Sequence, residues 1–422
     1  MRQPSNCLLR RDLIGAAALL FTALVATAIQ AEENWPRWGG PDGSSHTVET
    51  GLPLSWTEAD TAWKTSLEGF GQSMPCIWGD RIFLTTALDG GRQRLVFAID
   101  RRTGRQLWKH VAWSGEPEKT HNMNGHASAT CATNGKIVVA FFGRGGLHAY
   151  SLDGELLWSR DLGQFDGPWG TAASPIFYGD LVIQNCDSES PEAALLAVES
   201  RTGETVWSTP REVIRGWSTP IVIKTANREE LVLNGHSQIR GYDPASGREL
   251  WSCASFSGRG EPVPAFAHGK LFVVNGLAGD IYCVRPGGDG DVTATHRPWH
   301  TPRRAGRDLP SPVVIGEYLL ACSMPGILFC YDCETGKELW KERIGPKFAT
   351  TPLVAEGHAY FQSEDGQTIV IEPGPTMKTI AQSKLESPSD ELFRASIVPC
   401  QGQLFIRSSK NLYCIGNGAN AK

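Results

Sequence analysis

Short apolar runs alternate with polar turns along most of this chain, and no long helical pattern interrupts them. Five segments share one pattern: an apolar strand, a polar turn closed by Gly, and a second strand ending in Trp. These segments are 98–108, 149–158, 197–207, 241–251 and 330–340. The Gly supplies the positive φ that a tight hairpin turn needs. The pattern therefore predicts a series of β-hairpins, with weaker copies over 283–299 and over 370–380, where Ile380 replaces Trp.

A second marker recurs ahead of each hairpin, as a small or apolar residue followed by Pro where an apolar strand begins. The steps are Met74-Pro75, Ser174-Pro175, Thr219-Pro220, Val263-Pro264, Ser311-Pro312, Thr351-Pro352 and Val398-Pro399, with Thr130-Cys131 in the one missing place. The eight steps are spaced by 40 to 56 residues. Each repeat therefore holds four short strands, which is the content of one propeller blade.

The last repeat, 395–415, ends after its third strand. The segment 56–67 carries Trp63 in the matching place and can supply the missing outer strand. Closing the ring in this way removes the free sheet edges that would invite aggregation. We predict an all-β fold in which 32–422 form a single eight-bladed β-propeller domain. The alternative is seven blades, with one segment wrongly split.

Residues 1–31 have the features of a signal peptide. Arginines precede an apolar run over 13–26 that is shorter than a membrane span. The Arg10-Arg11 pair fits a twin-arginine signal, and a general secretory signal is the alternative. Cys7 lies ahead of the apolar run, so it is not a lipoprotein cysteine. We expect a periplasmic or secreted protein with no transmembrane segment in the mature chain.

The net charge of the whole chain is −5, and loss of the signal, with three positive charges and one negative, gives −5 − 2 = −7. A mildly acidic surface gives no reason to expect nucleic acid or anionic lipid as a partner. We expect a protein or glycan partner in the envelope, and a monomeric protein.

The string Ala-x-Asp-x-x-Thr-Gly-x-x-x-Trp resembles the tryptophan-docking motif of the pyrroloquinoline-quinone (PQQ) propellers, over nearly all of 56–415. The resemblance implies that each Trp stacks between blades against a Gly turn. The residues concerned are Trp63, Trp108, Trp158, Trp207, Trp251, Trp340, Gly104, Gly154, Gly203, Gly247 and Gly336. The family includes quinone-dependent dehydrogenases and non-catalytic relatives such as outer-membrane protein assembly factor B, an eight-bladed scaffold. Segments 34–43 and 119–126 look like parts of planctomycete-type secreted propellers.

The candidate binding patch is the polar insertion between the first two blades, which contains His121, Asn124 and His126. Long propeller loops gather at the ends of the central channel, where groups from several blades converge. His121 and His126 are candidate metal ligands if a third ligand comes from another blade. A polar loop packed by hydrogen bonds is the alternative.

Two groups of basic residues precede inner strands and can reach the same channel mouth. They are Arg211 and Arg215, with Trp217, before the fourth blade, and Arg303, Arg304 and Arg307 before the sixth. Such arginines suit an anionic ligand, and solvated loop charges are the alternative.

Known catalytic patterns are missing from the sequence. The quinoprotein dehydrogenases that the chain resembles carry an adjacent Cys-Cys disulfide and a Ca²⁺ held by Glu, Asn and Asp; no two cysteines are adjacent here, and no local motif matches that Ca²⁺ set. The acidic loop 287–291 offers oxygen ligands for Ca²⁺ but lacks the later bidentate Glu. We assign no catalytic residue and no cofactor. Our hypothesis is a non-catalytic exported scaffold for binding or protein interaction, and the alternative is a PQQ- or metal-dependent oxidoreductase.

Overall fold

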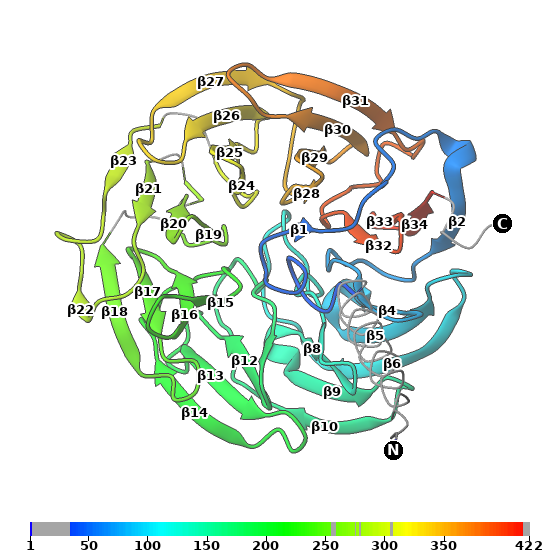
Figure 1. Cartoon of the computed structure of the whole chain (residues 1–422). Coiled ribbons are helices and arrows are strands. Elements are labelled where there is room, and N and C mark those ends of the chain that lie inside the picture. Colours follow the sequence, from blue (N-terminus) through cyan, green and yellow to red (C-terminus); the bar gives the residue numbers. More distant parts are fainter. Residues whose placement is uncertain (2–33, 255–258, 275, 278–279, 304–306, 417–422) are drawn as a thin grey trace.

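The computed structural model describes residues 1, 34–254, 259–274, 276–277, 280–303 and 307–416. The expected signal peptide therefore lies outside the described residues, apart from Met1. Eight β-sheets follow one another around a ring and form an eight-bladed β-propeller (Figure 1). The eight-bladed all-β prediction is confirmed, and the seven-bladed alternative is wrong.

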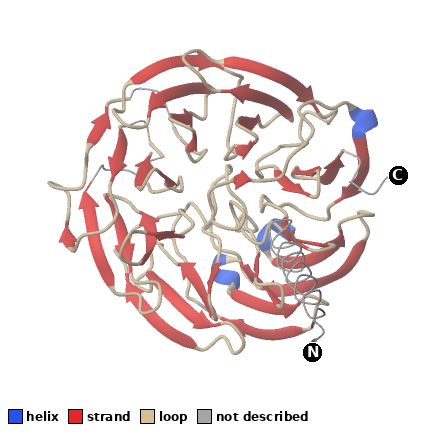
Figure 2. Ribbon diagram, in the orientation of Figure 1, coloured by secondary structure: helices blue, strands red, loops and turns tan. Residues whose placement is uncertain are grey.

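Helices are almost absent from the described residues (Figure 2). Three short 3-10 turns occur, and they are η1 (Glu58–Asp60), η2 (Asp89–Gly91) and η3 (Gly143–Gly145). No helix within the described ranges has the length and apolar character needed to cross a membrane.

Each of the first four blades has four consecutive strands, numbered from the channel outward. They are β3 (Cys76–Trp78), β4 (Arg81–Leu88), β5 (Gln93–Asp100) and β6 (Gln106–Ser114); β7 (Ala132–Thr133), β8 (Ile137–Phe141), β9 (Leu147–Ser151) and β10 (Leu156–Arg160); β11 (Ile176–Tyr178), β12 (Leu181–Asn185), β13 (Ala194–Glu199) and β14 (Thr205–Pro210); and β15 (Ile221–Lys224), β16 (Glu229–Asn234), β17 (Gln238–Tyr242) and β18 (Glu249–Ala254).

Blades 5 to 7 follow the same plan, and two short strands are added in parallel at sheet edges of blades 4 and 7. They are β19 (Ala265–Ala267), β20 (Lys270–Val273), β21 (Ile281–Val284) and β23 (Trp299–Thr301); β24 (Val313–Ile315), β25 (Tyr318–Cys322), β26 (Ile327–Asp332) and β27 (Glu338–Arg343); and β28 (Leu353–Ala355), β29 (His358–Gln362), β30 (Gln367–Glu372) and β31 (Lys378–Lys384). The additions are β22 (Gly290–Asp291) beside β18 and β1 (His46–Thr47) beside β28.

Blade 8 takes its strands from both ends of the chain. The inner three strands are β32 (Val398–Cys400), β33 (Gln403–Arg407) and β34 (Asn411–Ile415), and the outer strand is β2 (Thr61–Ser66). Trp63 lies opposite Cys414 in the β2–β34 pairing, as the repeat predicted. The two ends of the chain thus close the ring.

The side chain of Arg407 crosses the interface between blades 8 and 1. It is buried and donates hydrogen bonds to the carbonyl oxygens of Ser73 (2.8 Å) and Thr85 (2.7 Å). Burial without a carboxylate partner lowers the pKa of Arg407 to about 9. The closing interface therefore has a polar clamp as well as strand pairing.

Indole rings lie against the turns of neighbouring blades around the outside of the ring. Five indole N–H groups donate to backbone carbonyls at 2.8–3.3 Å, and the pairs are Trp63 with Arg101, Trp108 with Leu152, Trp158 with Ser200, Trp299 with Cys333 and Trp340 with Gly374. A Cβ on Gly104, which has φ +71°, would stand 2.6 Å from the Trp63 ring. The turn glycine is thus required both by its backbone conformation and by the indole beside it.

Three blades depart from this arrangement. In blade 3 the Trp207 ring lies against Gly247, but its buried N–H has no hydrogen-bond partner among the described residues. Trp251 is fully buried, and its indole donates to the Glu230 carboxylate at 2.7 Å instead of to a backbone turn. The reason is the longer loop of blade 5, which places β22 beside β18 at Trp251. In blade 7, Ala381 and not Ile380 faces Val370, so the predicted Ile in the Trp position is wrong by one residue.

The residues just before the inner strands form a hydrogen-bonded ring around the channel, here called the hydroxyl belt. In six places the backbone N–H of one blade donates at 2.9–3.2 Å to a hydroxyl of the next blade. The accepting residues are Thr130, Ser174, Thr219, Ser311, Thr351 and Ser396. Met74 and Val263 hold the equivalent positions without a hydroxyl, and the belt is interrupted there. Ser396 takes the place that the sequence assigned to Val398, which lies inside β32.

The segment 34–47 crosses the centre of the ring (Figure 1). It joins blade 1 by paired backbone bonds between Trp35 and Ile77. It joins blade 7 through β1, and blade 6 through His46, whose imidazole contacts the carbonyl of Val314 at 2.7 Å. All these contacts are at the ends of inner strands away from the hydroxyl belt, so the segment covers that end of the channel.

Candidate functional site

A cavity of about 210 Å³ lies at the end of the channel where the loops between blades meet. All eight blades contribute to its wall. The lining residues are Gln72, Met74, His121, Met123, Asn124, Ser128, Thr130, Trp169, Ala172, Trp217, Thr219, Glu261, Val263, Arg307, Leu309, Ser311, Ala349, Thr351, Arg394 and Ser396, together with Trp38 of the central segment. Because 34–47 cover the opposite end of the inner strands, the cavity is closed at that side and opens toward the loops.

Four of the nine residues that the sequence placed at the channel mouth line this cavity: His121, Asn124, Trp217 and Arg307. The His121 ring lies against the Trp169 ring, with centroids 5.0 Å apart. Its Nδ1 accepts the N–H of Met123 at 3.3 Å, so the neutral ring carries its proton on Nε2. His121 therefore offers a hydrogen-bond donor from an aromatic wall.

Asn124 and Trp217 hold the wall together. The Asn124 amide donates to the carbonyl of Trp169 at 2.9 Å, and its oxygen accepts the Ser128 hydroxyl at 2.6 Å. The indole of Trp217 donates to the carbonyl of Gly170 at 2.7 Å. Asn124 thus ties the insertion of blade 2 to the loop of blade 3, and Trp217 ties the loop of blade 4 to the same loop.

Two guanidinium groups lie over Trp169. Arg215 is 5.2 Å and Arg259 4.8 Å from the ring centroid, which is cation–π distance. Arg215 also forms an ion pair with Glu189. Arg259 forms no ion pair with any carboxylate of the described residues, and burial together with Arg307 and Arg215 lowers its pKa.

Two ion pairs lie at the mouth of the cavity. Arg307 pairs with Glu261 at 2.8 Å, and Arg394 pairs with Glu364 at 3.0 Å. Burial raises the pKa of the Glu261 carboxyl, and the hydrogen bond from Arg307 opposes this shift. Arg394 also donates to the carbonyl of Met123 at 3.2 Å, so the loops of blades 8 and 2 meet here.

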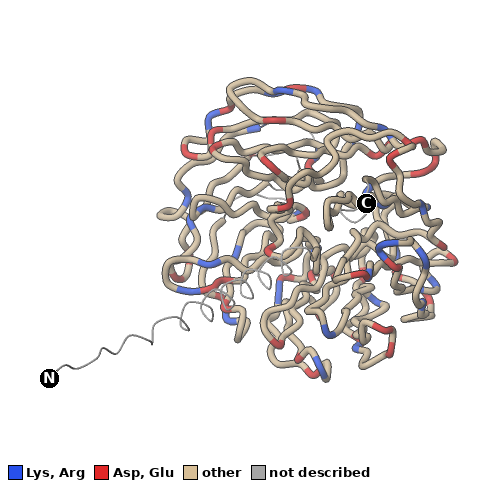
Figure 3. Tube along the Cα trace, turned by 45° about the vertical axis from the view of Figure 1, so that its right-hand side comes forward, with Lys and Arg blue, Asp and Glu red and all other residues tan. Residues whose placement is uncertain are grey.

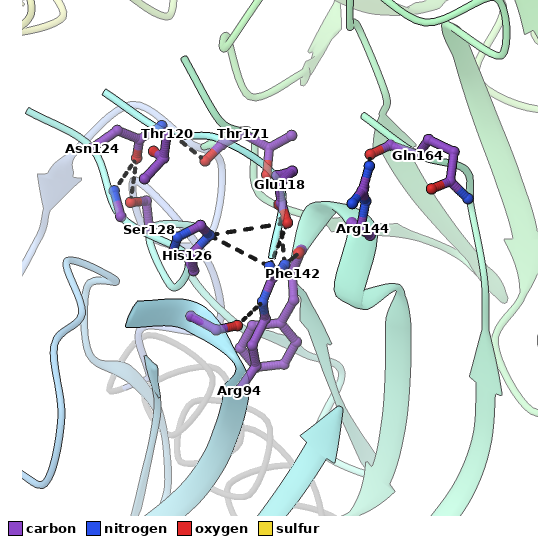
Figure 4. A network of polar contacts seen from close by, with 12 residues as sticks. Arg94, Glu118, Thr120, Asn124, His126, Ser128, Phe142, Arg144, Gln164 and Thr171 are labelled. Atoms are coloured by element: carbon purple, nitrogen blue, oxygen red, sulfur yellow. Dashed lines mark hydrogen bonds and ion pairs between the residues drawn. The ribbon is translucent and has the colours of Figure 1, made fainter. Parts of the chain in front are cut away.

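His126 does not line the cavity; it lies in a buried network at the base of the insertion (Figure 4). Arg94 forms an ion pair there with Glu118, and both side chains are almost fully buried. The Arg94 guanidinium also donates to the carbonyl of Phe142 and, at 3.2 Å, to that of Gly91. Burial and the charge of Arg94 lower the pKa of His126. His121 thus lines the cavity, whereas His126 belongs to the buried network of Arg94 and Glu118.

The remaining predicted arginines are engaged inside the protein. Arg211 pairs with Asp187 at 2.8 and 3.0 Å, and Arg303 forms a buried pair with Asp308. Arg304 lies outside the described residues. The sequence prediction missed Glu261, Arg394 and Trp38, because they come from separate repeats and share no local motif.

The side chains do not fit the quinone and calcium site that the resemblance raised as an alternative. The ten cysteines of the described part are buried and form no disulfide, so no adjacent disulfide lies beside the cavity. Within the described residues, no group of three or more His, Cys, Asp or Glu side chains could hold a metal ion. The acidic loop 287–291 is held by Arg228, which donates to the carbonyl of Gly288 at 2.6 Å.

Comparisons with known proteins point to one group of propellers. The family model described as outer membrane protein assembly factor BamB matches 54–167 and 277–374. BamB of Alkalilimnicola ehrlichii is 24% identical over 204 residues, which are 46% of this chain and 50% of that protein. The chain thus matches only about half the length of this curated relative.

Two solved structures share the fold over most of the chain. BamB from Moraxella catarrhalis has a TM-score of 0.63 and 14% identity, covering 86% of this chain and 98% of that one. A europium-containing methanol dehydrogenase has a TM-score of 0.70 and 11% identity, covering 93% and 100%. At these identities the likeness shows the fold alone.

Proposed function

Since this chain belongs to the PQQ-like β-propeller family whose model is described as outer membrane protein assembly factor BamB, we propose that it is a non-catalytic binding scaffold of the cell envelope. The expected leader over 1–31 supports export to the periplasm or the cell exterior. We infer that the mature protein is a monomer whose partner is another envelope protein.

This proposal rests on one observation: ion pairs hold the loops in place at one end of the propeller. Buried or nearly buried ion pairs hold the loops of several blades, and they are Arg94–Glu118, Arg211–Asp187, Arg303–Asp308 and Arg394–Glu364. Loops that are ordered before binding lose little conformational entropy when a partner docks. The loop end is therefore suited to recognising a protein surface.

Surface charge is consistent with this proposal. Lys and Arg are interspersed with Asp and Glu along the trace, with no large region of one sign in view (Figure 3). Such a surface favours a specific partner over general attraction to a polyanion.

Site-specific crosslinking in the producing cells tests the proposal. Lys119 is exposed in the insertion at the loop end, and Lys136 is exposed in the β7–β8 turn at the other end of the same blade. A photoreactive amino acid at position 119 should give a discrete adduct with one envelope protein. The same amino acid at position 136 is the matched control and should give none.

Two results would contradict the scaffold function. One is an equal adduct pattern from both positions. The other is turnover of a substrate by the purified protein, abolished by a single substitution at the cavity. Fractionation of the cells checks the proposed location, because a protein retained in the cytoplasm cannot serve the envelope.

A further inference from the structure

The hydroxyl groups at the base of the cavity can still donate hydrogen bonds. Five members of the hydroxyl belt line the cavity: Thr130, Thr219, Ser311, Thr351 and Ser396. Each oxygen already accepts a backbone N–H from the neighbouring blade. A hydroxyl has one proton to donate besides its acceptor sites, and no acceptor within the described residues takes these protons. The base of the cavity is thus a ring of donors.

Aromatic rings also line the cavity. Trp38, Trp169 and Trp217 come from three separate parts of the chain, and His121 adds a fourth ring with a donor on Nε2. Flat apolar faces beside directed polar groups are the usual lining of small-molecule sites. A ligand here needs one apolar face and many hydrogen-bond acceptors.

The charge of the mouth favours an anion. Arg307 and Arg394 are balanced by Glu261 and Glu364, whereas Arg259 has no ion-pair partner among the described carboxylates. One guanidinium without an ion-pair partner therefore lies against the Trp169 ring of the cavity wall. The cavity is smaller than the about 300–1,000 Å³ that bury drug-sized ligands, so it suits a single ring.

We propose that this cavity binds one acidic sugar residue, a pyranose with a carboxylate, by stacking its ring on the indoles and accepting hydrogen bonds from the hydroxyl belt. The cavity opens within the loop end proposed to dock a protein, but this proposal rests on the cavity lining and not on that docking. Free uronic acid and the end of an acidic glycan share this chemistry.

Calorimetric titration of the purified mature protein with glucuronate, a short oligouronide, glucose and PQQ tests the proposal. Two cavity-filling variants, Ala172→Phe and Ala349→Phe, place a ring in the cavity from different blades without removing a hydrogen bond. Ala226→Phe adds the same ring to the exposed β15–β16 turn at the far end of the propeller and is the matched control. An unchanged melting temperature shows that each variant is folded.

We expect glucuronate to bind, glucose to bind about tenfold more weakly or worse, and both cavity-filling variants to lose affinity by about tenfold or more. Tighter binding of the oligouronide identifies a glycan end as the source, and equal binding identifies the free sugar acid. The proposal is overturned if neither acid binds, or if Ala226→Phe weakens binding as much as the cavity-filling variants. Preferential binding of PQQ in the cavity also overturns it. Failure of the crosslinking experiment leaves these outcomes unaffected.

Discussion

The hydroxyl of Ser311 accepts the backbone N–H of Val263 at 2.9 Å and so joins the inner strands of blades 5 and 6. Both residues are buried. Ser311→Ala leaves this N–H without its acceptor, and we expect it to lower the free energy of unfolding by about 1–3 kcal/mol. Chemical denaturation measures the change.

Ser311→Thr keeps the hydroxyl and serves as the control, with little loss expected. Val263→Thr adds a hydroxyl at one interruption of the belt, where the N–H of Thr219 can use it. We expect this variant to be as stable as the parent or slightly more stable. Equal losses in Ser311→Ala and Ser311→Thr would show that packing, and not the hydrogen bond, matters there.

The docked indoles differ in a way that a matched pair of variants can detect. Trp158 and Trp207 are equally buried, at 8% exposure. The Trp158 indole donates to the carbonyl of Ser200 at 2.8 Å, whereas the buried N–H of Trp207 has no partner. Trp158→Phe should therefore cost about 1 kcal/mol more than Trp207→Phe in denaturant unfolding.

Removing the whole ring should cost far more than removing its N–H. We expect Trp207→Ala to lower stability by about 3–5 kcal/mol, because the ring is buried between blades and leaves a void beside Gly247. An unchanged denaturation midpoint would contradict the docking role at that blade.

The buried pair of Arg94 and Glu118 should behave as a unit. Arg94→Met leaves the Glu118 carboxylate buried without its cation, and we expect a loss of about 3–5 kcal/mol. Adding Glu118→Gln removes the uncompensated charge and should restore part of that loss. Additive losses in the double variant would mean that the two side chains are not coupled.

Acid should destabilise the protein through His148. Burial lowers its pKa below the ordinary value of 6.5; Nε2 donates to the carbonyl of Gly145 at 2.6 Å, and Nδ1 accepts from Ser159. As the pH falls below 6.5, the unfolded chain takes up the proton before the folded chain does, so stability is full above this value and declines toward the lower folded pKa. Denaturation midpoints between about pH 7.5 and 5 should fall less steeply in His148→Gln than in the parent. Parallel curves for the two proteins would exclude this contribution.

The repeat was readable from the sequence because each blade carries its own local signal. A Trp after a Gly turn marks the outer strand, and Trp63 revealed the closing strand although its partner β34 is at the other end of the chain. The prediction that each Trp docks on a neighbouring turn was wrong for Trp251. A local sequence pattern does not show that the Glu230 carboxylate lies within hydrogen-bond distance of the indole.

The candidate site was only partly predictable for a related reason. His121 and Asn124 lie in one insertion and attract attention together, whereas Glu261 and Arg394 reach the cavity from other blades. Arg211 was a candidate for the channel mouth, but it pairs with Asp187, which stands 24 positions earlier and belongs to no shared motif. Whether a charged side chain faces the cavity depends on its burial and on ion pairs with residues of other repeats. Both are set only when the ring of blades has closed.

The composite eighth blade also sets the order of events when the protein is made. Ser66 at the end of β2 donates to Asn411 across 345 positions of the chain. A chain that emerges from its N-terminus must hold β2 without a partner until β34 appears, and such a distant contact is slow to form. A copy cut short before β34 keeps seven nearly complete blades but leaves two strand edges open to other chains. Synthesis through β34 therefore closes the two strand edges that could otherwise pair with other chains.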